Sequence, residues 1–394
     1  MSDVPHLRFP EFSGEWEKCK FGDIATGFDY GMNAAAKPFD GENKYIRITD
    51  IDEASSTYND TDIVSPDATL TDNYVVNDRD ILLARTGAST GKSYLYRKSD
   101  GKLYYAGFLI RANVTEHNPY FVFSQLHTHR YWRWVSIMSA RSGQPGINSQ
   151  EYSSFPIFTT SLQEENKIST LLSLLDERIA TQNKIIEKLQ SLIKGLVDEL
   201  MTVLLKGKLY PFSSFYIKAG EGGTPTTSVV EYYTEGTIPF IKIEDLSCKY
   251  LTNNKDFITE LGMQKSSAWL IPSKSVIYSN GATIGAISIN EYPVCTKQGI
   301  LGIVPNTNIN VEYLYLLMSS SYFSKEISRI ITEGTMKTAY LKDINHIKCP
   351  LPSMAQQKNI TNLTSSIEEK LSIEQELLRC LNLQKQYLLR MMFI

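Results

Sequence analysis

The sequence has 394 residues, of which 42% are apolar and 21% are charged, and its formal net charge at pH 7 is −3. This length predicts two or three domains, and the composition is typical of globular proteins. No apolar run approaches the ~18 residues that a transmembrane helix needs, and no apolar signal core lies near the first residue, so we expect a cytoplasmic protein. No segment is basic overall, which argues against DNA binding by bulk charge.

Residues 1–161 alternate short apolar segments with glycine-containing turns, as a mixed domain of helices and strands does. Alternating apolar and polar residues at 45–51 predict a half-buried strand. Residues 81–92 predict a strand, a glycine turn and a second strand. We also expect strands within 103–114 and 155–157, a short helix at 119–138 and a polar loop at 142–147. Together these elements predict one globular domain.

A heptad repeat follows in residues 162–206 and predicts one long helix. Aliphatic residues recur on two seven-residue ladders, no proline interrupts them, and Gly195 lies off the seam. Residues 168–203 would form a rod of about 54 Å. The expected helix–helix seam consists of Leu172, Leu175, Ile179, Gln182, Ile186, Leu189, Ile193 and Leu196.

The rest of the chain repeats this organisation. A strand at 240–246 matches 45–51, and 275–286 matches 81–92. Strands within 294–304 and 347–352, a helix at 311–331 and a polar loop at 333–338 complete a second domain, expected at 207–352. A second long helix at 353–394 matches the first when 192 is added to each residue number, which places Gln182 on Glu374. Its expected seam residues are Ile367, Leu371, Glu374, Leu378, Leu381 and Leu388.

Several short motifs resemble ligand sites but have the wrong spacing or residues. Residues 87–92 have three residues between the glycines, where a phosphate loop has four. Residues 118–121 resemble an adenine methyltransferase signature, but Asn followed by Pro is also a favourable helix start. His127 and His129 fall on an expected helix, where positions i and i+2 diverge, so we expect a surface pair and no metal site. The five cysteines form no C-x-x-C pair, and we expect reduced thiols.

Residues 130–134 mix cations with aromatic residues, as nucleic-acid surfaces do. The equivalent pair in the second half is also aromatic, so we expect Tyr131 and Trp132 to be core residues. Arg130 and Arg133 then remain as candidates for DNA contact.

The whole chain resembles the specificity subunit of a Type I restriction-modification system. The resemblance rests on the Gly-Ala-x-x-Gly turns at 87–91 and 281–285, the Gly-Gly-Thr-Pro run at 222–225, the Pro-Leu-Pro run at 350–352 and the two heptad segments. Each motif is weak alone, but together they are specific.

This resemblance implies an α+β protein in which two α/β target-recognition domains form a pseudo-two-fold repeat, separated by two long helices in an antiparallel coiled coil. Each domain would recognise one half of a bipartite site on double-stranded DNA, while the helices would set the spacing and dock the methyltransferase subunits. Gln182 and Glu374 would lie near one another at mid-length.

The same resemblance implies partner subunits and assigns the chemistry to them. Two methyltransferase (M) subunits would use S-adenosylmethionine, and two restriction and translocase (R) subunits would use ATP and Mg. The chain itself would be non-catalytic, with no cofactor and no metal of its own.

DNA contacts are expected from the turns and from the loop before each long helix, because Arg, Lys, Gln and Asn side chains there can reach base edges or phosphates. In the first domain the candidates are Arg47, Arg85, Thr86, Lys92, Arg130, Arg133, Arg141 and Gln144. In the second domain they are Lys242, Tyr278, Asn280, Lys297, Gln298 and Lys337.

Two other functions fit parts of the pattern. A coiled-coil scaffold that binds no nucleic acid would explain the heptads but not the polar, glycine-rich turns, and a salt-dependent mobility shift with duplex DNA would separate it from a specificity subunit. An orphan adenine DNA methyltransferase would need a glycine-rich pocket for its methyl donor, which we do not find. Binding of labelled S-adenosylmethionine to the isolated chain would discriminate that alternative.

Overall fold

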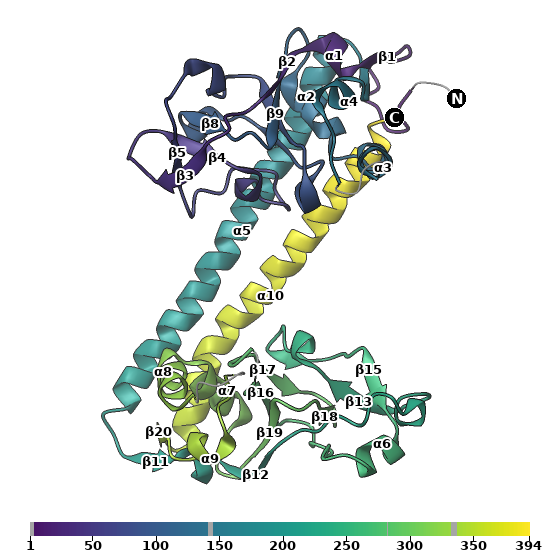
Figure 1. The fold of residues 1–394 in the computed structure, drawn as a ribbon. Coiled ribbons are helices and arrows are strands. Elements are labelled where there is room, and N and C mark those ends of the chain that lie inside the picture. Colours follow the sequence, from purple (N-terminus) through teal and green to yellow (C-terminus); the bar gives the residue numbers. More distant parts are fainter. Residues whose placement is uncertain (1–3, 141–144, 282, 332–336) are drawn as a thin grey trace. The chain divides into compact units, whose positions relative to one another are not determined.

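The computed structural model describes residues 4–140, 145–281, 283–331 and 337–394, and the chain divides into two compact units. The first unit comprises residues 1–184 and 376–394, and the second comprises residues 185–375. Each unit therefore contains one globular part and a segment of each long helix (Figure 1). Within the described ranges, no helix is both long and apolar enough to cross a membrane.

The globular part of the first unit is a mixture of short strands and helices. Its elements are β1 (Glu17–Lys20), α1 (Phe21–Ile24), β2 (Ala25–Tyr30), β3 (Ala35–Pro38), β4 (Lys44–Ile46), β5 (Val64–Asp67), β6 (Asp80–Ala84), β7 (Ser93–Leu95), β8 (Leu103–Tyr105), β9 (Leu109–Val114), α2 (Pro119–Gln125), α3 (His129–Ser139), α4 (Ser149–Ser153) and β10 (Pro156–Thr159).

The main sheet of the first unit has the strand order β2-β9-β6-β7 and is antiparallel throughout. Strand β6 is buried along its whole length. Ile81 and Leu83 pack in the cluster that includes α2, whereas Leu82 and Ala84 pack in the cluster that includes β8. Because both faces of β6 are covered, the turn that follows it starts from a fixed position.

The globular part of the second unit repeats this arrangement. Its elements are β11 (Leu209–Pro211), β12 (Tyr216–Glu221), β13 (Ile238–Ile241), β14 (Tyr250–Leu251), β15 (Asp256–Ile258), α6 (Glu260–Gln264), β16 (Val276–Ser279), β17 (Ile287–Asn290), β18 (Cys295–Thr296), β19 (Ile300–Pro305), α7 (Val311–Ser319), α8 (Ser321–Ile330), α9 (Leu341–Ile344) and β20 (Lys348–Pro350). The main sheet has the order β12-β19-β16-β17-β14, and β16 is buried along its length as β6 is.

The strand predicted at 45–51 and its repeat in the second unit both end early. In each unit a 3-10 turn follows the strand, because an aspartate captures a backbone N–H group. Asp50 Oδ2 accepts a hydrogen bond from the N–H of Arg47, and Asp245 Oδ2 accepts one from the N–H of Lys242, both at 2.8 Å. Such a local side-chain bond competes with the strand ladder, so the alternating pattern extends beyond the strand.

The helix predicted at 119–138 and its repeat are each divided into two helices. The Thr128 side chain accepts a hydrogen bond from the N–H of Tyr131 at the start of α3, and the Ser320 side chain accepts one from the N–H of Phe323 at the start of α8. Ser and Thr at such N-cap positions favour a new helix start. A continuous helix was therefore the wrong prediction in both units.

The break before α3 leaves the His127 side chain half-buried, with both ring nitrogens bonded inside the unit. Its Nδ1–H donates to the carbonyl oxygen of Phe123, and its Nε2 accepts from the hydroxyl of Ser56, both at 2.9 Å. Burial, followed by the positive charge of Lys385, lowers the pKa of His127 to about 4. The expected surface pair with His129 is thus incorrect, because only His129 is exposed.

The long helices are α5 (Leu162–Leu204) and α10 (Met354–Met391), and both begin with the same contact. Glu165 Oε2 accepts a hydrogen bond from the N–H of Asn118 at 2.8 Å, and Gln357 Oε1 accepts one from the N–H of Asn310 at 2.7 Å. Both acceptor residues are fully buried. Since Asn118 and Asn310 cap α2 and α7, each globular part is joined to the first turn of the long helix that follows it.

Every predicted seam residue on the long helices is buried or half-buried. In the first unit, Leu172 and Leu388 share a hydrophobic cluster, and Lys385 Nζ lies 2.6 Å from Asp176 Oδ1. Rising numbers on α5 meet falling numbers on α10, so the two segments are antiparallel within this unit. Gln182 and Glu374 belong to different units, and their proximity stays a prediction.

The N-terminal segment connects both long helices within the first unit. The N–H of Leu7 donates to the carbonyl oxygen of Met391 at 2.8 Å. Arg8 Nε and Nη2 donate to Glu164 Oε1 and Oε2, each at 2.7 Å, and the Glu164 side chain is 1% exposed. Although burial opposes it, the hydrogen bond from Arg8 keeps the pKa of Glu164 below its usual range.

Replacing Arg8 should destabilise the first unit strongly. Arg8→Met leaves a buried carboxylate without its cation, and we expect a loss of about 3–5 kcal/mol in the free energy of unfolding, measured by urea denaturation. The double variant Arg8→Met/Glu164→Gln is the control, and should recover most of this loss because no buried charge remains. Equal destabilisation in both variants would contradict the role given to the ion pair.

The burial of His127 predicts a pH dependence of stability. The pKa of His127 is lower in the folded chain than the value of about 6.5 for an exposed histidine. Protons therefore bind preferentially to the unfolded chain as the pH falls below about 6.5. We expect a loss of about 1 kcal/mol between pH 7.5 and 5.5, which the variant His127→Gln should lack. Urea unfolding of both proteins at the two pH values measures this loss in the free energy of unfolding, and an equal loss in both proteins would refute the prediction.

Candidate nucleic-acid interface

In the first unit, three backbone segments meet at the turn that follows β6. The N–H of Arg85 donates to the carbonyl oxygen of Phe108 at 3.0 Å, and the N–H of Ile147 donates to the carbonyl oxygen of Arg85 at 2.9 Å. Thr86 also forms an isolated antiparallel bridge with Gly146. The turn after β6 is therefore joined both to the β8–β9 turn and to the loop before α4. We call residues 85–87, 106–108 and 145–147 the first turn cluster.

The second unit joins the equivalent segments in the same way. The N–H of Asn280, after β16, donates to the carbonyl oxygen of Gly299 at 3.0 Å, and the N–H of Ala339 donates to the carbonyl oxygen of Asn280 at 3.0 Å. We call residues 279–281, 297–299 and 337–339 the second turn cluster. In both units, the turn after the buried strand is thus hydrogen-bonded to the loop that precedes a short helix, α4 or α9.

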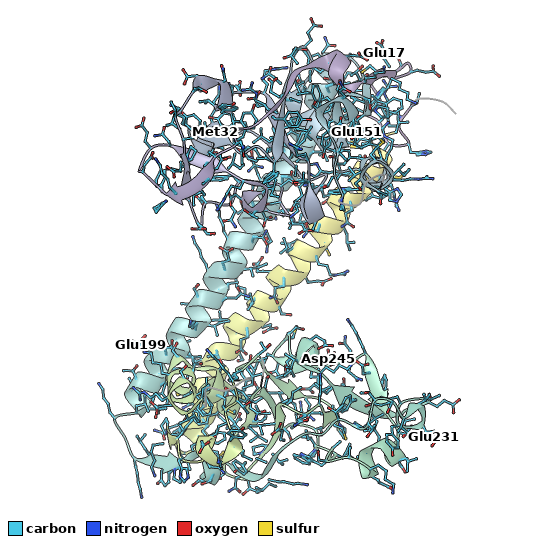
Figure 2. All side chains as sticks on the ribbon, viewed as in Figure 1. Glu17, Met32, Glu151, Glu199, Glu231 and Asp245 are labelled. Atoms are coloured by element: carbon cyan, nitrogen blue, oxygen red, sulfur yellow. The ribbon has the colours of Figure 1, made fainter. Side chains whose placement is uncertain are left out.

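A fourth segment closes each cluster through a glycine. The N–H of Gly31 donates to the carbonyl oxygen of Leu109 at 3.1 Å, and the N–H of Gly222 donates to that of Ile300 at 2.9 Å. A Cβ on Gly31 would lie 2.3 Å from the carbonyl oxygen of Ala106, and one on Gly222 would lie 2.1 Å from that of Thr296. Only glycine permits this approach. In the first unit the segment continues into Met32, labelled in Figure 2.

Arg85 is held by neutral groups. Its guanidinium carbon lies 4.7 Å from the centre of the Tyr30 ring, and Nη1 donates to the carbonyl oxygen of Gly107 at 3.4 Å. The Tyr30 hydroxyl accepts a hydrogen bond from the N–H of Ser149 at 3.2 Å, which together with Arg85 lowers the pKa of the phenol. Among the described residues, no carboxylate lies within salt-bridge distance of Arg85. Its positive charge is thus oriented but not neutralised.

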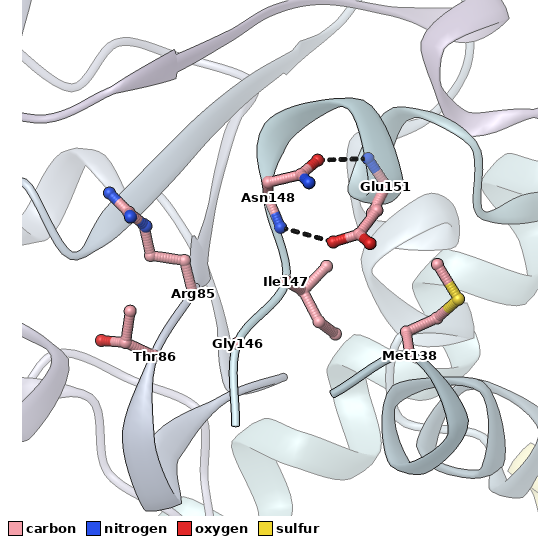
Figure 3. A pocket seen from close by; sticks show the side chains of 7 residues that line it. All are labelled: Arg85, Thr86, Met138, Gly146, Ile147, Asn148 and Glu151. Carbon is pink, nitrogen blue, oxygen red and sulfur yellow. Dashed lines mark hydrogen bonds between the residues drawn. The ribbon is translucent and has the colours of Figure 1, made fainter. Parts of the chain in front are cut away.

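Arg85 also borders a cavity of about 260 Å³. Figure 3 shows Arg85 and Thr86 across from Asn148 and Glu151. The N–H of Asn148 donates to Glu151 Oε2, and the N–H of Glu151 donates to Asn148 Oδ1, both at 2.9 Å. These reciprocal bonds fix the side of the cavity that faces Arg85. The described lining residues are Arg85, Thr86, Met138, Gly146, Ile147, Asn148 and Glu151.

Three of the predicted cations have carboxylate partners. Arg47 Nη2 lies 2.7 Å from Asp50 Oδ1, Lys92 Nζ lies 3.3 Å from Glu53 Oε2, and Lys242 Nζ lies 2.9 Å from Asp256 Oδ2. These pairs reduce the positive charge that the side chains can offer to a phosphate. Arg47, Lys92 and Lys242 are therefore weaker candidates than Arg85.

Two predicted contact residues lie in the core, so their proposed surface roles must be corrected. Tyr278 is 2% exposed on β16, where strand burial on both faces puts its ring against Phe323. Asn280 is 1% exposed, and its Nδ2 donates to the carbonyl oxygen of Ala339 at 3.1 Å. Asn280 thus supports the second turn cluster from inside. In the same cluster, Lys297, Gln298 and Lys337 are exposed.

The aromatic and cationic residues at the start of α3 lie on different faces of the helix, so some are buried and others are exposed. Tyr131 is buried as expected, but Trp132 is 43% exposed, so its expected core position is wrong. Arg130 lies 4.6 Å from the Phe158 ring centre, and burial lowers its pKa to about 10. Arg133 is exposed. Arg130 is half-buried, so Arg133 is the more accessible of these two arginines.

Arg141 and Gln144 lie outside the described residues. The sequence reasoning also missed two aromatic residues at the first turn cluster, Tyr30 at 41% exposure and Phe108 at 58%. Each is adjacent to a glycine in sequence, Gly31 and Gly107. An aromatic residue beside a glycine was the available signal, whereas the predicted contacts were chosen for their polar side chains.

Comparison with known proteins gives matches in both halves of the chain. The model of the family described as "Type I restriction modification DNA specificity domain" matches residues 13–191 and 215–383. The chain is 30% identical over 154 residues to the Type I restriction enzyme MjaIX specificity subunit of Methanocaldococcus jannaschii, covering 38% of this chain and 35% of that protein.

The chain is also 30% identical over 179 residues to the EcoR124I/EcoR124II specificity subunit of Escherichia coli, covering 42% of this chain and 43% of that protein. These alignments thus span less than half of either relative. The fold is similar to the crystal structure of a Type I restriction-modification system S subunit from M. genitalium, with a TM-score of 0.60, 17% identity and 99% of each chain covered.

Proposed function

The chain belongs to the family of Type I restriction modification DNA specificity proteins, and from this premise we propose that it is the sequence-specific DNA-recognition subunit of a Type I restriction-modification complex. Each globular part recognises one half of a bipartite site on double-stranded DNA. The chain performs no chemistry itself and acts in the cytoplasm.

The observation that carries this proposal is the pair of turn clusters. Both use the same backbone hydrogen bonds, between the turn after the buried strand, a second strand turn and the loop before α4 or α9. Their side chains differ, with Arg85 and Phe108 in the first unit where Asn280 and Gly299 occur in the second. A common frame with different side chains suits two domains that dock similarly but recognise different bases.

The proposed domain boundaries follow the repeat. Residues 1–161 and 207–352 are the target-recognition domains, and residues 162–206 and 353–394 are the helices that set the spacing and dock partners. We propose two methyltransferase subunits that use S-adenosylmethionine and two motor and nuclease subunits that use ATP and Mg. Their basic surfaces would supply phosphate contacts that this chain, with a net charge of −3, does not provide by bulk charge.

Among the predicted contacts, we propose that Arg85 and Thr86 act in the first domain, together with Arg133. In the second domain, Lys297, Gln298 and Lys337 take this role. These side chains are exposed or half-buried. Arg85 is the strongest candidate, because its guanidinium is oriented by Tyr30 and retains its charge.

Arg85→Ala should weaken binding to the cognate duplex by about 1–3 kcal/mol, or about 5- to 150-fold. The cognate site is first identified by methylation mapping in a host that expresses the chain with its methyltransferase partner. Affinity is then measured by fluorescence anisotropy against the cognate duplex and a scrambled duplex at several salt concentrations. A base contact loses affinity only for the cognate duplex, whereas a phosphate contact weakens both duplexes and lowers the salt slope by about one.

Arg97→Ala is the matched control, because Arg97 is an exposed arginine of the same domain outside the first turn cluster. It should leave discrimination between the two duplexes unchanged. If Arg85→Ala binds the cognate duplex as tightly as the unaltered chain, the interface has been misplaced. If the unaltered complex does not distinguish the duplexes, the proposed function itself is wrong.

A further inference from the structure

The first turn cluster exposes an aromatic ring on a fixed turn. Phe108 is 58% exposed, although several backbone groups around it are hydrogen-bonded. Its carbonyl oxygen accepts the N–H of Arg85 at 3.0 Å, and the N–H of the preceding Gly107 donates to the carbonyl oxygen of Met32 at 2.8 Å. The N–H of Leu109 completes the turn by donating to the carbonyl oxygen of Ala106 at 2.8 Å. The ring is thus held outward by a turn that has little freedom.

The neighbours of Phe108 indicate what the ring would meet. Arg85 directly follows β6, and its N–H donates to the carbonyl oxygen of Phe108. The Arg85 guanidinium lies over the ring of Tyr30, which is 41% exposed. A cation beside exposed aromatic rings is the combination that contacts phosphates and base faces together. Apolar side chains that protrude beside such cations can also enter a duplex as wedges between base steps.

The second unit provides an internal comparison. Gly299 occupies the position of Phe108, since its carbonyl oxygen accepts the N–H of Asn280 just as that of Phe108 accepts the N–H of Arg85. Gly299 has a φ of +86°, which L side chains rarely adopt. The second turn cluster therefore presents no side chain at this point.

On the basis of the proposed function, we propose that Phe108 is a wedge residue, whose ring enters one base step of the half-site bound by the first unit and partly unstacks it. The second unit binds its half-site without such a wedge. Phe108 thus contributes specificity through the deformability of a base step as well as through contact, because flexible steps unstack at lower cost. The rigid turn favours insertion, since little backbone ordering is needed on binding.

The test uses 2-aminopurine, whose fluorescence increases when it loses stacking, placed at one position at a time in both halves of the mapped site. The full chain is assembled with its methyltransferase partner, and the methylated adenine is left unlabelled because methyltransferases extrude it. We expect brightening at one base step of a single half-site. Phe108→Ala should abolish this brightening and weaken binding about 5- to 150-fold, whereas Phe108→Leu, still an apolar wedge, should retain both the brightening and the affinity.

Phe257→Ala is the matched control, because Phe257 is a 42% exposed phenylalanine on β15 of the second unit. It should leave the brightening unchanged. If Phe108→Ala brightens the probe as the unaltered chain does while Arg85→Ala still weakens binding, the wedge is refuted and the proposed DNA interface stands. If Phe108→Ala instead reduces recovery of the methyltransferase partner and leaves unstacking unchanged, Phe108 is a protein contact and the proposal fails.

Discussion

The structure depends on one buried contact that occurs twice. In each unit, a side-chain oxygen on the first turn of a long helix, the carboxylate Oε2 of Glu165 or the amide Oε1 of Gln357, accepts the N–H of the asparagine that caps a helix of the globular part. Breaking this hydrogen bond would leave a buried polar group without a partner, at a cost of about 1–3 kcal/mol. Each globular part therefore has a fixed orientation on its own helix. The position is shared, but the chemistry is not: Glu165 also bonds His117, while Gln357 donates to two backbone carbonyls.

Above this contact, both globular parts have the same arrangement of turns. The core of each unit covers both faces of one strand, β6 or β16, and the turn after it is held by two neighbouring turns through backbone bonds. Backbone bonds do not depend on side-chain identity, so side chains at the surface can change without loss of the frame. This separation of frame from side chain is the physical basis for assigning two different recognition surfaces to one chain.

The sequence predicted the periodic parts of this fold well, because heptads and buried strands leave regular patterns. Both long helices agree with the structure, and so does the 192-residue offset between the contacts at their starts. Each predicted strand–turn–strand segment contains its first strand and its turn, while the second strand begins directly after it, at Ser93 or Ile287. It failed where a single side chain interrupts a pattern. Thr128 starts a new helix within an apparently continuous one, and Asp50 ends a strand by binding the N–H of Arg47.

The site residues were harder to predict, because residue type does not indicate burial. Tyr278 and Asn280 have polar groups suited to DNA contact, yet both are enclosed, and no local pattern shows that both faces of β16 are covered. Phe108 was overlooked for the converse reason. An apolar residue in a strand-rich segment suggests a core position, but Phe108 lies in the turn between β8 and β9 and is 58% exposed.

The central claim is that each globular part recognises its own half of the DNA site, independently of the other. Exchange of residues 207–352 for the equivalent part of a relative, followed by single-molecule methylation mapping in a host that supplies the methyltransferase partner, tests it most directly. The account predicts new bases in one half-site, with the other half-site and the spacer length unchanged. Changes in both half-sites, or a change in spacer length with the bases unchanged, would contradict it.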